Sequence, residues 1–103
     1  LRPRACAAGE VLIREGEVGA EMYFVVRGQV EAFDKAGKIL ATRGEGDVFG
    51  ELALLHRQPR AASVRTVTPC DLIVLTKHDF DHVLHEHPAF AGTLRAEAER
   101  RYG

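Results

Sequence analysis

Short apolar segments alternate with glycine-containing turns from the start of the chain to about residue 76. Residues that favour β-strands gather in the segments 11–13, 22–26, 30–33, 39–42, 63–67 and 72–75. Turn signals separate these segments at spacings of about 8–12 residues, which is typical of an all-β sandwich or barrel. We predict hairpin turns at residues 27–29 and 35–37, because Gly28 and Gly37 can adopt the positive φ of tight turns.

The pattern changes after Lys77, where the apolar positions take the period of a helix. A first helical face is formed by Phe80, Val83 and Leu84. A second segment opens at Pro88, a residue well tolerated at a first helical position, and its stripe is Phe90, Leu94 and Ala98. Consecutive apolar residues also predict a short helix over residues 50–55. The sequence therefore predicts one domain over residues 1–103: a β-roll over about 4–76 and a helical tail over about 77–102.

Composition narrows the class of protein. With 46% hydrophobic and 28% charged residues, the chain has the balance of a globular domain rather than a disordered segment. Its net charge of −1 argues against a nucleic-acid surface, which normally needs a basic stripe. The sequence contains no secretory signal and no apolar run near the roughly 18 residues of a membrane span.

The cysteines and histidines give little indication of a disulfide, a metal site or a catalytic site. Cys6 and Cys70 are too few for a metal framework, so we expect two reduced thiols in a cytosolic protein. A disulfide between them is conceivable only if the first and last strands pair. A helix surface with titratable groups suffices to explain the histidines after Lys77, and a metal site formed by them is a poorly supported alternative; they are His78, His82, His85 and His87. We predict no cofactor or metal and, since no catalytic arrangement stands out, no enzymatic activity.

The strongest chemical signal lies in residues 47–64. Gly50 and Glu51 begin a short apolar turn, and Arg60 follows nine residues after Glu51. A turn with outward backbone N–H groups favours an anion, and an arginine adds a planar charged fork suited to phosphate. Glu51 would then accept from a neutral donor such as a sugar hydroxyl. The pattern indicates a ribose-phosphate ligand, although an ordinary surface ion pair remains the alternative.

Two stretches of this run resemble the phosphate-binding cassette of the cyclic nucleotide-binding domain family. They are Phe49-Gly50-Glu51-Leu52-Ala53 and Arg60-Ala61-Ala62-Ser63-Val64. The resemblance implies that Glu51 accepts from the ribose 2′-hydroxyl and that Arg60 pairs with the cyclic phosphate. Backbone amides around residues 50–53 and at Ala61 and Ala62 would complete the site. It also implies an eight-stranded, jelly-roll-like β-roll with a short cassette helix and two C-terminal helices.

The same resemblance bears on the base of the ligand. Many guanosine-preferring relatives have threonine after the arginine, whereas this chain has Ala61, so cyclic AMP is favoured over cyclic GMP. In relatives the last helix closes over the base through a residue near its end. Arg101 is the preferred lid residue, with Arg100 and Tyr102 as alternatives. A solvated basic helix end explains these arginines equally well.

The segment from the cassette to Arg101 is similar to the C-terminal sensor of bacterial cyclic nucleotide-gated potassium channels. This implies a cytoplasmic sensor domain of an inner-membrane channel or related transporter, able to form homo-oligomers in the full-length protein. The expected partner is a cyclic nucleotide, with no nucleic acid bound through this segment. Three alternatives remain open: a transcription factor of the catabolite-activator kind, a kinase regulatory subunit, and a roll that has lost its ligand.

Overall fold

The computed structural model describes residues 2–51, 54, 58–89, 92, 96 and 100. Within this part of the chain, strands predominate and one helix follows them. The strands are β1 (Arg2–Cys6), β2 (Val11–Ile13), β3 (Glu21–Arg27), β4 (Val30–Phe33), β5 (Ile39–Arg43), β6 (Val48–Phe49), β7 (Ser63–Thr66) and β8 (Cys70–Thr76). The helix is α2 (Lys77–Glu86).

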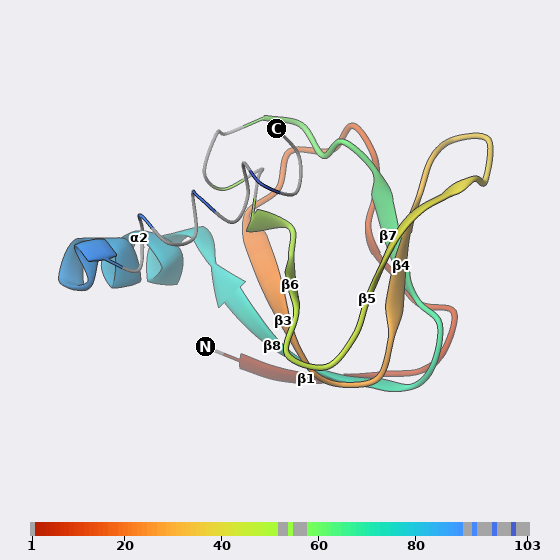
Figure 1. Ribbon diagram of the computed structural model, residues 1–103, viewed down its shortest axis with the longest axis horizontal. Coiled ribbons are helices and arrows are strands. Elements are labelled where there is room, and N and C mark those ends of the chain that lie inside the picture. Colours follow the sequence, from red (N-terminus) through yellow and green to blue (C-terminus); the bar gives the residue numbers. More distant parts are fainter. Residues whose placement is uncertain are drawn as a thin grey trace.

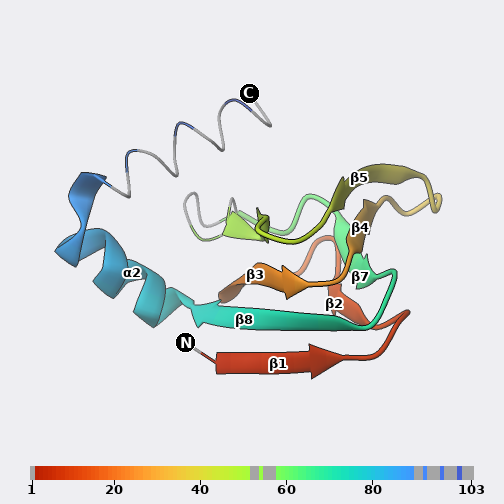
Figure 2. The same cartoon turned by 60° about the horizontal axis from the view of Figure 1, so that its bottom comes forward.

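The strands form two antiparallel sheets of four strands each. One sheet has the order β1-β8-β3-β6, and the other has the order β2-β7-β4-β5. The first sheet lies on the side of helix α2, and the second lies on the far side (Figure 1). Figure 2 shows β1, β8 and β3 as one layer, with α2 continuing from the end of β8. This mainly β roll with a helical extension confirms the predicted fold class.

The two sheets bury one apolar core between them. Its most enclosed members are Val25 of β3, Val30 of β4 and Leu72 of β8, each exposed by 1% or less. A second, smaller cluster joins Met22, Leu54 and Phe80. The adjacent residues Met22 and Tyr23 of β3 belong to different clusters, because side chains alternate between the two faces of a strand. The second sheet covers one face of the first sheet, and Phe80 of helix α2 joins Met22 of β3 in the second cluster, at the end of the sheet where α2 begins.

All six strands predicted from the sequence are present, with small differences at their ends. The structure adds β1 and β6, which the hydrophobic pattern does not reveal. Strand β1 buries only Cys6 of its five residues, so it lacks the usual alternation of an amphipathic strand. Strand β6 has two residues and is too short for a periodic signal.

One of the two predicted hairpins is wrong. Residues 27–29 join β3 to β4, which belong to different sheets. Gly28 has a φ of 103°, and a Cβ there would lie 2.5 Å from the carbonyl oxygen of Pro69. The turn thus carries the chain between sheets at a point that admits no side chain. The other hairpin is confirmed: β4 pairs with β5, and Gly37 donates to the Asp34 carbonyl at 2.9 Å.

Helix α2 begins where the sequence predicts it. The Thr76 hydroxyl accepts from the Asp79 backbone N–H at 3.2 Å, which caps the first turn. Phe80 points into the second core cluster and is fully buried. The second predicted helix, from Pro88, falls mainly outside the described residues. Of the helices the structure describes, none has the length and hydrophobicity needed to span a membrane.

Pairing of β1 with β8 places Cys6 directly opposite Cys70. This is the arrangement under which a disulfide was conceivable. Both cysteines are nevertheless free and buried. Burial raises the pKa of the Cys6 thiol, so this residue behaves as a small core side chain rather than as a reactive thiolate.

Candidate functional site

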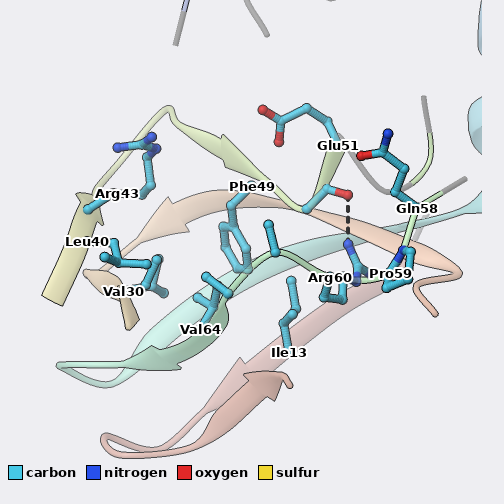
Figure 3. Close-up of a pocket in the computed structure, with 15 residues that line it drawn as sticks. Ile13, Val30, Leu40, Arg43, Phe49, Glu51, Gln58, Pro59, Arg60 and Val64 are labelled. Atoms are coloured by element: carbon cyan, nitrogen blue, oxygen red, sulfur yellow. Dashed lines mark hydrogen bonds between the residues drawn. The ribbon is translucent and has the colours of Figure 1, made fainter. Parts of the chain in front are cut away.

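A cavity of about 450 Å³ opens beside the second sheet. This volume lies within the range of about 300–1,000 Å³ that is usual for small-molecule sites. Strands β2, β4, β6 and β7 supply apolar side chains to its wall: Ile13, Val30, Phe49 and Val64. The long polar side chains that border it belong to Arg43, Glu51, Gln58 and Arg60 (Figure 3).

Both halves of the cassette border this cavity. Phe49 ends β6 and stacks on Tyr23, with ring centroids 4.9 Å apart and planes 8° from parallel. Gly50 then takes a φ of 85°, a backbone conformation that side-chain-bearing residues rarely adopt. A Cβ at Gly50 would also lie 2.9 Å from Nη1 of Arg60. Glycine is therefore required here both for the turn and for the approach of the arginine.

Backbone carbonyl groups hold the Arg60 side chain in place. Its Nη1 donates to the Gly50 carbonyl at 2.8 Å, the dashed line in Figure 3, and its Nη2 donates to the Glu21 carbonyl at 2.5 Å. The Arg60 backbone is fixed as well, since its N–H donates to Glu17 and its carbonyl accepts from Gly16, each at 2.8 Å. The guanidinium thus stands in one orientation at the wall of the cavity.

The electrostatics at Arg60 favour an anion. Only 9% of this residue is exposed, and burial lowers the pKa of its guanidinium, while Tyr23, Glu21 and Glu51 raise it by smaller amounts. Arginine remains protonated at neutral pH even so. Within the described part of the chain, none of the ion pairs includes Arg60. The alternative of a simple ion pair with Glu51 therefore has no support in the geometry.

Further hydrogen-bonding groups surround this charge. Glu51 borders the cavity, and its side chain is almost fully buried at 1% exposure. Ala61 and Ala62 also line the cavity, and no acceptor for their backbone N–H groups occurs among the residues that the structure describes. A cation, two backbone donors and a carboxylate consequently surround one compact space.

The structure brings together six of the nine site residues predicted from the sequence. Phe49, Gly50, Glu51, Arg60, Ala61 and Ala62 all line the cavity. Leu52, Ala53 and Arg101 lie outside the described residues. In those that are described, no cluster of three or more metal-binding side chains occurs.

Two residues at this site were missed by the sequence reasoning. Gly19 lies against the Arg60 guanidinium so closely that a Cβ at Gly19 would lie 2.2 Å from Cζ. Arg43 ends strand β5 and lines the cavity. Gly19 lies in a segment that resembles the family's opening hairpin, but that resemblance does not indicate a contact with Arg60, and no motif points to Arg43.

Comparison with known proteins agrees with this geometry. Residues 3–87 match the family model of the cyclic nucleotide-binding domain. Across all 103 residues the chain is 39% identical to a cyclic nucleotide-gated potassium channel of Rhizobium etli, of which it spans 28%.

Solved structures show the same architecture. A catabolite activator protein of Thermus thermophilus superposes with a TM-score of 0.90 at 31% identity, over 97% of this chain and 49% of that one. The regulatory domain of Toxoplasma gondii PKA, solved with cAMP, superposes with a TM-score of 0.76 at 38% identity, over 80% and 33% of the two chains. From the family model and this similarity over its full length, the chain belongs to the cyclic nucleotide-binding domain family.

Proposed function

We propose that residues 1–103 form one domain that binds a purine 3′,5′-cyclic nucleotide and acts as a regulatory sensor without catalysis. The observation that carries this proposal is the buried Arg60 guanidinium, held by two carbonyl groups at a mostly apolar cavity. Two of its five N–H groups are engaged by the protein, and the others are available to an anion. A cyclic phosphate diester is a monoanion of suitable size.

With the phosphate bound at Arg60, the contacts of the remaining ligand groups can be proposed in turn. The backbone N–H groups of Ala61 and Ala62 would donate to the phosphate, and the Glu51 carboxylate would accept from the ribose 2′-hydroxyl. Gly50 gives the phosphate close access to the backbone. Leu52 and Ala53 would complete the cassette, and Arg101 would close over the base, as predicted from the sequence.

Cyclic AMP is our preferred ligand. Ala61 has no hydroxyl group with which to contact the amino group of guanine, so the site lacks one means of selecting cyclic GMP. The Toxoplasma gondii structure, which contains cAMP, is 38% identical to this chain and supports the same choice.

The parent protein that best fits the similarity is an ion channel with this domain on its cytoplasmic side. The support is the 39% identity to the Rhizobium etli channel. A catabolite-activator-like transcription factor is the second candidate, supported by the TM-score of 0.90. Six apolar spans in the parent protein would favour the channel, and a helix-turn-helix would favour the transcription factor.

Isothermal titration calorimetry with cyclic AMP tests the binding proposal. Replacing Arg60 with alanine should weaken binding by about 30-fold to several thousand-fold, because losing a buried charged partner costs about 2–5 kcal/mol. Arg65→Ala is the matched control. Arg65 lies on β7, pairs with Glu31 at 2.7 Å and does not line the cavity. Failure of the wild-type domain to bind, or equal affinity in Arg60→Ala, would exclude the proposed function.

The role of Glu51 is tested with a modified ligand. Glu51→Ala removes the acceptor and should weaken binding of cyclic AMP by about 10- to 150-fold, since hydrogen bonds to charged groups contribute about 1.5–3 kcal/mol. A 2′-deoxy ligand should bind wild type less tightly but lose little further affinity in Glu51→Ala, where no acceptor for the 2′-hydroxyl is left at this position. Additive losses in this double-mutant cycle would show that the carboxylate does not contact the 2′-hydroxyl.

A further inference from the structure

A second arginine borders the same cavity at the side away from Arg60. Arg43 is the last residue of β5 and lies opposite Val30 of β4 in the ladder. In Figure 3, Arg43, Leu40 and Val30 occupy one side of the pocket, and Arg60, Gln58 and Pro59 occupy the other. The cavity therefore has a cationic group at each side and an apolar wall between them.

The Arg43 side chain has few partners in the protein. It is half-buried, and its Nη1 donates to the carbonyl of the adjacent Thr42 at 3.0 Å. No carboxylate among the described residues pairs with it. A guanidinium carries five N–H groups and no acceptor, so four donors remain beside the cavity. Leu40, which is 51% exposed, adds a bare apolar surface next to them.

These features match one edge of a purine. With the phosphate at Arg60 and the ribose at Glu51, as proposed above, the base extends toward Leu40 and Arg43. A guanidinium fork matches the adjacent O6 and N7 acceptors of guanine, whereas adenine offers N7 beside a donating amino group. Arg43 can thus donate two hydrogen bonds to a 6-oxopurine, through O6 and N7, but only one to adenine, through N7.

We propose that Arg43 is a specificity-determining residue that contacts the base edge of the ligand and admits 6-oxopurine cyclic nucleotides. This inference rests on the proposed function and concerns selectivity alone. Arg43 favours cyclic GMP, whereas Ala61 favours cyclic AMP. The site should therefore discriminate less sharply between the two ligands than Ala61 by itself implies. Removing Arg43 makes the site more selective for cyclic AMP.

Titrations with three ligands test this role: cyclic AMP, cyclic GMP and cyclic IMP, which has O6 and N7 but no 2-amino group. Arg43→Met keeps the length of the side chain and removes its donors. We expect affinity for cyclic GMP and cyclic IMP to fall about tenfold, and affinity for cyclic AMP to change less than about threefold. Arg43→Lys keeps the charge without the planar fork and should restore only part of the loss.

The possible outcomes separate the two proposals. Binding of cyclic AMP by wild type, with equal losses for all three ligands in Arg43→Met, would overturn the role of Arg43 and leave the proposed function intact. Full recovery in Arg43→Lys would also overturn it, because charge alone would then explain the effect. Wild-type protein that binds none of the three ligands overturns both proposals. Circular dichroism and a thermal melt verify that each variant folds.

Discussion

The Arg60 guanidinium rests against Gly19, a residue that bears no side chain. Gly19→Ala would place a methyl group 2.2 Å from Cζ of Arg60 in the present arrangement. Because the end of a flexible side chain can move, we expect the guanidinium to shift rather than the backbone. Affinity for cyclic AMP should fall about tenfold, while the free energy of unfolding drops by only about 1 kcal/mol. Calorimetry and urea denaturation measure the two effects.

Gly44→Ala is the control for this substitution. A Cβ at Gly44 would meet its nearest neighbour, the Gly28 carbonyl oxygen, at 3.9 Å, which is ordinary contact. Gly44→Ala should therefore bind as wild type does. Unchanged affinity in Gly19→Ala would mean that the orientation of the guanidinium does not matter for binding.

Residues of the site differ in how far the sequence reveals them. Glu51 and Arg60 are predictable, because the cassette gathers their chemistry into one contiguous run of the chain. Gly19 and Arg43 are not, because their roles arise only when a loop and the end of β5 come to lie beside Arg60 and the cavity. A glycine that faces a guanidinium has the same local sequence signal as a glycine in any turn.

Among the elements, helix α2 depends on Phe80 for its attachment to the first sheet. Phe80 is fully buried with Met22 and Leu54. Phe80→Ala should lower the free energy of unfolding by about 3–5 kcal/mol, as a cavity replaces the ring. His82→Ala changes an exposed position of the same helix and should alter stability by less than about 0.5 kcal/mol. Similar denaturation midpoints for the two variants would show that α2 does not pack as described.

The elements that the sequence predicts are those whose apolar residues follow a clear strand or helix pattern. Strands β2, β3, β4, β5, β7 and β8 carry alternating or continuous apolar residues, and α2 carries a helical stripe. Strand β1 is mostly exposed, so its position depends on pairing with β8 rather than on its own pattern. The turn at Gly28 shows a related limit. A glycine in the sequence predicts that the chain turns there, but it does not tell whether the two flanking strands pair with each other or join different sheets.

At the scale of the whole molecule, ligand binding should appear as stabilisation. A ligand that binds only the folded state at 100 times its Kd adds about 2.7 kcal/mol to the free energy of unfolding. For a domain of this size that corresponds to a rise in Tm of about 10–20 °C. Differential scanning calorimetry with saturating cyclic AMP measures this rise. Arg60→Ala at the same ligand concentration should show a far smaller one, and an unchanged wild-type Tm would contradict specific binding.

The pairing of β1 with β8 joins the first strand of this domain to the last. During synthesis on the ribosome, residues 2–6 emerge early but have no partner until residues 70–76 have left the exit tunnel. The first sheet therefore cannot close co-translationally while β7 is still being made, and native contacts of this long range form slowly. A translational stall before β8 would leave nascent strand edges exposed to chaperones or to aggregation.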